Sequence, residues 1–213
     1  MSEPISLVPS RAGKAAGAVV ETPARVALVT LGCAKNLVDS EIMAGLLAHG
    51  GFTMTGDVGT ADVAVVNTCA FIGPSQKESI DRILELAALK REGTLRGLVV
   101  AGCLAQRFQS DILREIPEVD AVVGTGQVDA IVRVAHRVRR GGAERILEVG
   151  PPGTAVDLTA HRAVSTPRHL AYLRIADGCD FRCTFCIIPS LRGDLRSRTV
   201  ESIVEEAGRL AGA

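Results

Sequence analysis

The sequence lacks net charge and long apolar runs, and each absence excludes a class of protein. Its 213 residues include 24 basic and 24 acidic side chains, so the overall charge indicates neither a general nucleic-acid surface nor electrostatic attachment to a membrane. The small residues at 15–20 follow one Arg and one Lys, and they are too few and too weakly apolar for a signal peptide or a membrane span. We therefore expect a cytoplasmic protein with no membrane or DNA partner.

Two common nucleotide-binding motifs are also missing, since the chain has no GxGxxG sequence and no P-loop. Its four histidines show no spacing typical of metal ligands; they are His49, His136, His161 and His169. What the chain does contain is six cysteines. Because the cytosol disfavours disulfides, six cysteines there point to metal binding or redox chemistry.

Apolar runs and helical spacings alternate through the first two thirds of the chain. Residues 1–24 show no apolar periodicity and predict a disordered leader. The predicted strands are 26–31, 62–67, 97–101, 120–123 and 145–149, and the predicted helices are 37–48, 76–90, 106–116 and 128–138. Short β-branched runs of this kind suit parallel strands buried on both faces. The pattern predicts an α/β domain over 25–149 with an open, parallel, Rossmann- or flavodoxin-like sheet.

A Pro- and Gly-containing stretch at 150–168 predicts a linker, and a second domain is expected over 169–213. That part contains a predicted strand at 170–176, a cysteine-bearing loop and a helix from about residue 199. The apolar face of this helix is formed by Val200, Ile203, Val204, Ala207 and Leu210. Because one strand and one helix cannot close a sheet, we expect this face to be open to water.

Three cysteines in that loop form the most specific signal in the chain. Cys179, Cys183 and Cys186, here called the second trio, can direct three thiolates at one cubane and leave one iron without a protein ligand. S-adenosylmethionine can chelate such an iron and be cleaved by one electron to a radical. Phe185 is placed to pack on its adenine. The alternative is a zinc knuckle, but zinc usually takes four ligands and the loop contains no His.

The other cysteines, Cys33, Cys69 and Cys103, each follow a predicted strand closely and are here called the first trio. Parallel strands end at one edge of their sheet, and open α/β sheets bind ligands at that edge. The three thiolates can therefore converge on a second cluster. The alternative is three buried core cysteines, since Cys is among the most buried residue types.

Polar residues beside the cysteines are weaker candidates. Those on the N-terminal side are Asn36, Asp39, Ser40, Glu41, Asn67 and Thr68, and helix capping or turn chemistry explains most of them. Arg192, Arg196 and Arg198 follow the second trio. They can meet the carboxylate of a nucleoside cofactor or an acidic substrate, but a solvated basic loop is the commoner arrangement.

Four segments of the chain resemble the methylthiotransferases, a family of radical S-adenosylmethionine enzymes. They are 31–41 (LGCAKNLVDSE), 67–72 (NTCAFI), 101–107 (AGCLAQR) and 178–193 (GCDFRCTFCIIPSLRG). Within that family, the words Ala-Lys-Asn and Ile-Ile-Pro-Ser are similar to the branch that modifies an aspartate of ribosomal protein S-twelve. The branch that modifies a tRNA adenosine is the first alternative.

The resemblance implies two 4Fe-4S clusters and S-adenosylmethionine as cofactors. The second trio would hold the cluster that forms the radical, and the first trio an auxiliary cluster carrying the sulfur to be transferred to the β-carbon of the aspartate. An electron donor such as flavodoxin or ferredoxin is implied, and no catalytic residue beyond the cluster ligands is identified. Family members continue through a radical-enzyme barrel and a TRAM domain, so the resemblance implies a truncated chain, for which a non-catalytic cluster-binding fragment is the second alternative.

Overall fold

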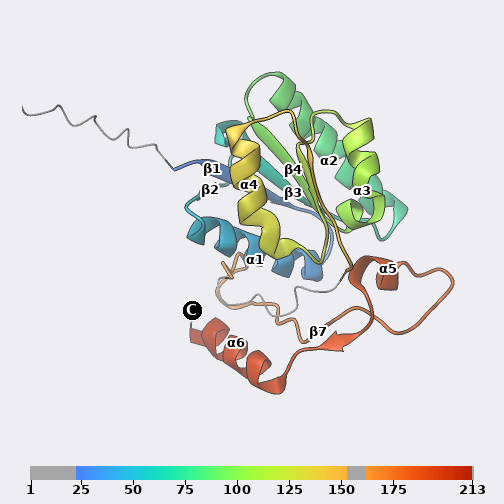
Figure 1. The fold of residues 1–213 in the computed structure, drawn as a ribbon. Coiled ribbons are helices and arrows are strands. Elements are labelled where there is room, and N and C mark those ends of the chain that lie inside the picture. Colours follow the sequence, from blue (N-terminus) through green and yellow to red (C-terminus); the bar gives the residue numbers. More distant parts are fainter. Residues whose placement is uncertain (1–22, 153–161, 213) are drawn as a thin grey trace, which may run out of the picture.

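The computed structural model describes residues 23–152 and 162–212. Six parallel strands form one sheet in the order β2-β1-β3-β4-β5-β6 (Figure 1). They are β1 (Arg25–Thr30), β2 (Thr53–Thr55), β3 (Val63–Thr68), β4 (Gly97–Gly102), β5 (Ala121–Val123) and β6 (Ile146–Glu148). The predicted α/β class and parallel sheet are confirmed. The predicted leader lies almost wholly outside the described residues, and the predicted linker does so in part.

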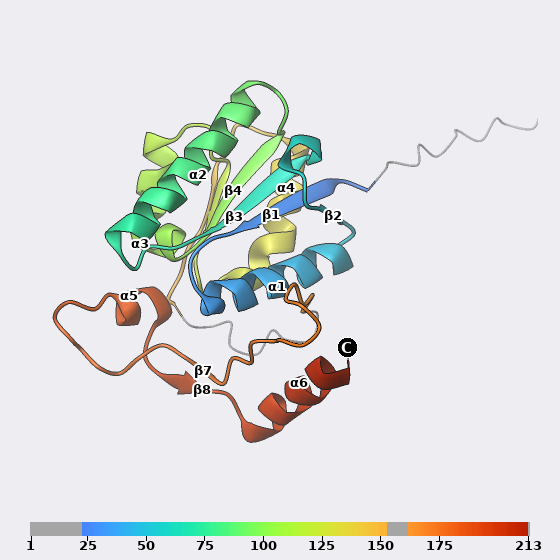
Figure 2. The same ribbon diagram turned by 180° about the vertical axis from the view of Figure 1, so that it is seen from behind.

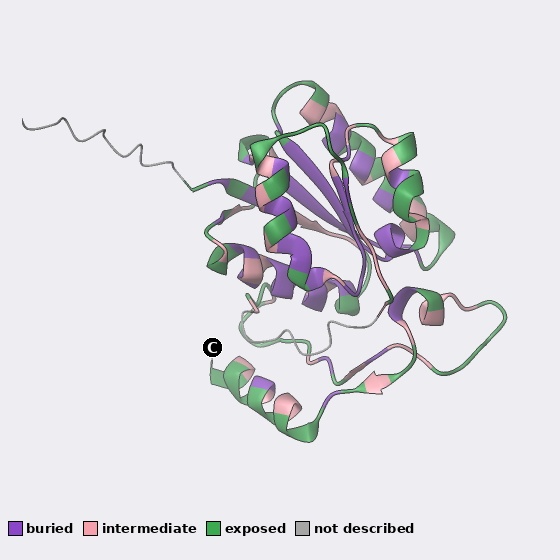
Figure 3. Cartoon of the chain, in the orientation of Figure 1, coloured by how far each residue is buried: buried purple, intermediate pink, exposed green. Residues whose placement is uncertain are grey.

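Helices cover both faces of the sheet. On one face lie α1 (Ala34–His49) and α4 (Ile131–Arg140), and on the other α2 (Gly73–Arg91) and α3 (Cys103–Glu115) (Figures 1 and 2). Side chains of β3 and β4 alternate between the two cores, so these central strands are mostly apolar, and every residue in them is buried (Figure 3).

Three short elements of the sheet domain were not predicted. Strand β2 pairs with β1 at one edge of the sheet, and its sequence, Thr-Met-Thr, is too short and polar to give an apolar pattern. The 3-10 turn η1 (Val58–Thr60) follows it, and a second, η2 (Val128–Ala130), precedes α4 where one continuous helix was expected. β2 adds a sixth strand at the edge of the sheet, and the order of the five predicted strands follows their alternation with helices.

Residues 162–212, here called the post-linker segment, lie along α1 and the carboxyl edge of the sheet (Figures 1 and 2). The prediction of a strand over 170–176 was wrong for most of its length. Only β7 (Ala176–Asp177) forms, paired antiparallel with β8 (Arg196–Ser197), and α5 (Ile188–Arg192) lies between them. An isolated strand has no neighbours to satisfy its backbone, so the stretch before β7 takes an irregular path instead.

Candidate functional site

The structure places the first trio at one edge of the sheet. Strands β1, β3 and β4 are neighbours, and Cys69 and Cys103 each follow the last residue of a strand directly, while Cys33 lies three residues beyond β1. Cys33 is the residue before α1, and Cys103 is the first residue of α3. Three neighbouring strand ends therefore carry one thiol each, at the edge where open α/β sheets bind ligands.

Glycines let these loops approach one another closely. Gly32 has a φ of +95°, and a Cβ added there would lie 2.7 Å from the Cβ of Cys69. Gly102 has a φ of +90°, and a Cβ there would lie 2.2 Å from the side-chain oxygen of Asn67. Both positions need the left-handed backbone and have no room for a side chain, so each glycine keeps a cysteine-bearing turn tight against its neighbour.

All six cysteines are free thiols, but their surroundings differ. In the first trio Cys33 is exposed, whereas Cys69 and Cys103 are buried. Among the described residues no three His, Cys, Asp or Glu side chains stand close enough together to hold a metal ion. Three thiolates are the donor set of an iron-sulfur cluster, and the thiols of either trio would have to turn toward one another to share one.

The second trio lies in the loop between β7 and α5. The backbone amide of Cys179 donates to the carbonyl of Gly193 at 3.0 Å, and that of Cys186 donates to the carbonyl of Cys183 at 3.0 Å. Cys183 is exposed and the other two thiols are partly exposed. Phe185, predicted to pack on an adenine, has an exposed fraction of 91%. The loop is closed at its base and open at its tip.

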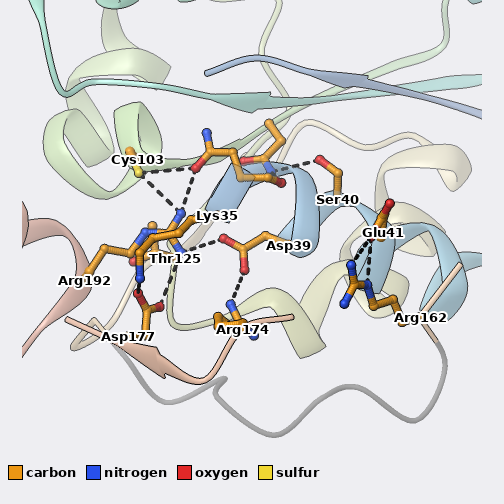
Figure 4. Close-up of polar contacts among 12 residues, drawn as sticks. Lys35, Asp39, Ser40, Glu41, Cys103, Thr125, Arg162, Arg174, Asp177 and Arg192 are labelled. Atoms are coloured by element: carbon orange, nitrogen blue, oxygen red, sulfur yellow. Dashed lines mark hydrogen bonds and ion pairs between the residues drawn. The ribbon is translucent and has the colours of Figure 1, made fainter. Parts of the chain in front are cut away.

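A buried arginine links the two groups of cysteines. Arg192, the last residue of α5, donates to Asp39 at 2.6 Å, to the side-chain oxygen of Asn36 at 2.7 Å and to the Sγ of Cys103 at 3.6 Å (Figure 4). Arg174 donates to the other carboxylate oxygen of Asp39 at 2.6 Å. One carboxylate of α1 therefore receives two guanidinium groups from the post-linker segment.

The start of the second-trio loop is fixed to the same helix. Lys35 of α1 donates to Asp177 at 3.0 Å, and Arg192 lies 3.5 Å from the other oxygen of that carboxylate. Burial alone would raise the pKa of Asp177, but Arg192 and Lys35 outweigh this effect and lower the pKa below its ordinary value. The carboxylate is thus kept ionised between two cations.

Burial and charge act on the Cys103 thiol in opposite directions. Burial raises the pKa of Cys103, the positive charge and hydrogen bond of Arg192 lower it, and the net shift is upward. For Arg192, burial lowers the pKa, but attraction to Asp39, Cys103 and Asp177 prevails and raises it. The guanidinium therefore stays charged beside a sulfur that burial tends to keep protonated.

A second ion-pair group holds the segment further along α1. Glu41 accepts from Arg162 at 2.7 Å and from the backbone amide of Ser165 at 2.7 Å. Arg162 also donates to Glu206 of α6 (Val200–Gly212) at 2.8 Å, and Glu206 pairs with Arg198. All four charged side chains of this group are at most 3% exposed.

These contacts correct two interpretations of the sequence. Asp39 and Glu41 do not cap α1; they lie inside the helix and pair with arginines more than 120 residues away. Arg192 and Arg198 do not form a solvated basic loop, because both are buried against carboxylates of this chain. The sequence offers one signal for these ion pairs, because Asp39 and Glu41 lie among the apolar residues of α1 that face the core. This signal does not identify the arginines with which they pair.

Asn36 and Asn67 also have structural contacts. The side-chain amide of Asn36 donates to the carbonyls of Leu31 and Thr68, each at 2.9 Å, and so joins the turns that precede Cys33 and Cys69. The amide of Asn67 donates to the carbonyl of Asn36 at 2.8 Å and to Ser40 at 3.0 Å. These side chains hold the first-trio turns together.

No helix among the described residues is both long and apolar enough to span a membrane.

Comparison with known proteins supports one family. A family model described as "Uncharacterized protein family UPF0004" matches residues 25–124. The chain is 49% identical over 187 residues to "Ribosomal protein uS12 methylthiotransferase RimO" of Pelotomaculum thermopropionicum, an alignment that covers 88% of this chain and 42% of the relative. The protein of the same name from Solibacter usitatus is 50% identical over 87% of this chain and 39% of that relative.

A third protein named RimO, from Symbiobacterium thermophilum, is 48% identical over 89% of this chain and 39% of its own length. The chain thus spans about two fifths of the length of the relatives it matches. All six cysteines lie on the part of the chain described above, from the sheet edge to the post-linker segment. The chain therefore belongs to the methylthiotransferase family, in the branch whose members are named RimO.

Proposed function

We propose that this chain is the cluster-bearing part of a radical S-adenosylmethionine methylthiotransferase that modifies the β-carbon of an aspartate in ribosomal protein uS12. The observation that carries the proposal is the polar network in which Arg192 contacts Cys103 of the first trio and Asp177, two residues before Cys179 of the second trio. A reaction that forms a radical at one site and transfers sulfur from another needs the two sites held in a fixed relation.

In this proposal the first trio holds an auxiliary 4Fe-4S cluster and the second trio holds the 4Fe-4S cluster that binds S-adenosylmethionine. When bound there, S-adenosylmethionine supplies one-electron chemistry that generates a carbon radical. The exposed ring of Phe185 is available to stack on the adenine, because no described side chain covers it. The post-linker segment from residue 169 onward would be the start of the radical-enzyme barrel.

The protein's own residues contribute position and charge. Lys35, Asp39 and Arg192 fix the second-trio loop to α1, and the buried guanidinium of Arg192 donates a hydrogen bond to Cys103. Hydrogen bonds and positive charge near cluster sulfurs favour the more negative, reduced state of a cluster. An electron donor such as flavodoxin or ferredoxin and a cytoplasmic location follow from the same proposal.

The substrate can be tested in cells that lack the full-length gene. We expect loss of a methylthio mass increment on uS12, measured by mass spectrometry of the intact ribosomal protein, and recovery when the gene is supplied. A variant gene with Cys183→Ala should fail to restore the increment, because it lacks one ligand of the second trio. Loss of methylthioadenosine from tRNA with uS12 unchanged would contradict this assignment and favour the tRNA branch.

A further inference from the structure

The loop that bears the second trio is held at both ends by residues that follow Cys33 closely in the sequence. Asp177, just before the loop, accepts from Lys35. Arg192, just after it, donates to Asn36 and Asp39. Lys35, Asn36 and Asp39 belong to the first two turns of α1, so both ends of the loop are attached to one helix that begins at the first trio.

Arg192 also touches a cysteine of the first trio directly. Its Nη2 atom lies 2.7 Å from the side-chain oxygen of Asn36 and 3.6 Å from the Sγ of Cys103, and Cys103 lies 3.7 Å from the same Asn36 oxygen. Each of these three side chains therefore contacts the other two, and Figure 4 shows Arg192 beside Cys103. Arg192 is 3% exposed and Cys103 is 8% exposed, so the guanidinium and the thiol are buried against each other.

We propose that Arg192 is a positioning residue that joins the two trios, since it fixes the second-trio loop to α1 and covers the Cys103 thiol with the same guanidinium. This proposal deepens the proposed function, on which it rests for its meaning in catalysis. Its physical consequence is independent of any cluster: movement of the loop away from α1 uncovers Cys103 and leaves Cys69, which Arg192 does not contact, as buried as before.

The chain contains a matched comparison for this role. Arg198 belongs to the same segment, is 5% exposed and pairs with the buried Glu206, but no described contact joins it to a cysteine. Replacing Arg198 therefore loosens the segment without removing the cover from Cys103. Replacing Arg192 removes both.

The test uses the reduced, iron-free 213-residue chain and measures the rate at which iodoacetamide labels each cysteine, by peptide mass spectrometry. The variant is Arg192→Lys, because Lys keeps a positive charge near the sulfur and loses the planar fork that reaches four partners at once. We expect Cys103 to be labelled about tenfold faster than in the wild type, because local opening exposes it. The ratio of Cys103 to Cys69 labelling should rise equally, and Arg198→Lys should leave that ratio unchanged.

Equal acceleration at Cys69 and Cys103, or an equal effect of Arg198→Lys, would overturn the proposal in favour of general loosening. An unchanged ratio in Arg192→Lys would overturn the covering role. If circular dichroism shows that Arg192→Lys does not fold, Asp39→Asn replaces it, since it preserves shape and removes the charge that holds Arg192; the same rise at Cys103 is expected. Failure of the wild-type chain to bind iron would contradict the proposed function and leave this result standing, because no iron is used.

Discussion

The sheet domain and the post-linker segment are held in place by different forces. The central strands β3 and β4 are fully buried and mostly apolar, and two layers of apolar helix side chains pack on them. Among the described residues from 162 to 212, Leu191 is the only buried apolar residue, whereas six charged side chains are buried. These charged residues are Arg162, Arg174, Asp177, Arg192, Arg198 and Glu206.

The two kinds of contact therefore have different roles: one stabilises the fold, and the other fixes the position of the post-linker segment. Burial of apolar surface stabilises a fold strongly and without regard to direction. A buried ion pair adds little net stability, because desolvation offsets the attraction, but a broken one is costly and so one arrangement is favoured over others. The sheet domain therefore supplies the stable scaffold, and the ion pairs fix where the second-trio loop stands on it.

The largest expected effect comes from opening the apolar core. Leu98→Ala removes a fully buried side chain from β4, and we expect it to lower the free energy of unfolding of the whole chain by about 2–5 kcal/mol. Urea denaturation followed by circular dichroism measures this. The matched change Leu84→Ala, at a side chain that is 47% exposed on α2, should cost far less. Equal losses of unfolding free energy in the two variants would show that burial in the apolar core does not stabilise the sheet.

Breaking the ion pairs should release the segment and spare the sheet. Asp39→Asn leaves two buried guanidinium groups without their shared carboxylate, and we expect docking to weaken by about 3 kcal/mol. Proteolytic cleavage within 162–212 should then accelerate on the order of a hundredfold, with hydrogen exchange in β3 and β4 unchanged. Asp111→Asn, which breaks an exposed pair with Arg114, is the control and should have no measurable effect. Faster hydrogen exchange of β3 and β4 in Asp39→Asn would contradict these separate roles.

A smaller effect is expected from crowding the first-trio turns. Gly32 and Gly51 both have positive φ, at +95° and +88°, so alanine strains the backbone at either position. A Cβ at Gly32 meets Cys69, whereas a Cβ at Gly51 meets nothing within 4 Å. Gly32→Ala should therefore cost about 1–3 kcal/mol more than Gly51→Ala in urea denaturation. Equal costs would mean that the turns do not press on each other.

The smallest effect concerns a surface pair at the edge of the sheet. The hydrogen bond from Arg133 lowers the pKa of Glu148 below its ordinary value of 4.5, although burial acts the other way. A lowered folded pKa contributes stability above 4.5, and that contribution disappears as the pH falls through the folded pKa. Between pH 7 and pH 3.5 the wild type should lose slightly more stability than Glu148→Gln. Parallel pH profiles would show that this pair contributes nothing.

The sequence predicted the sheet well because its signal is local. Buried parallel strands are apolar on both faces, so the runs VAVVNT and GLVVAG indicate such strands. The helices between them are predicted by the helical spacing of their apolar residues. The position of the first trio then follows from topology, because parallel strands all end at one edge. The short edge strand β2 has too few apolar residues for such a signal.

The post-linker segment could not be predicted in the same way. Its structure depends on pairs such as Arg162 with Glu41 and Arg174 with Asp39, which are 121 and 135 residues apart. A charged residue in a single sequence indicates solvent exposure unless its partner is known, so the sequence favours a solvated loop at Arg192 and Arg198 over buried ion pairs.

The central claim, that each trio binds its own cluster while Arg192 connects them, is tested most directly by counting iron and sulfide after anaerobic reconstitution of the 213-residue chain. We predict about eight irons per chain for the wild type and about four for either Cys69→Ala or Cys183→Ala, since each change removes one ligand of one cubane. Full retention or complete loss of iron in both variants, or one zinc and no sulfide in the wild type, would contradict the claim.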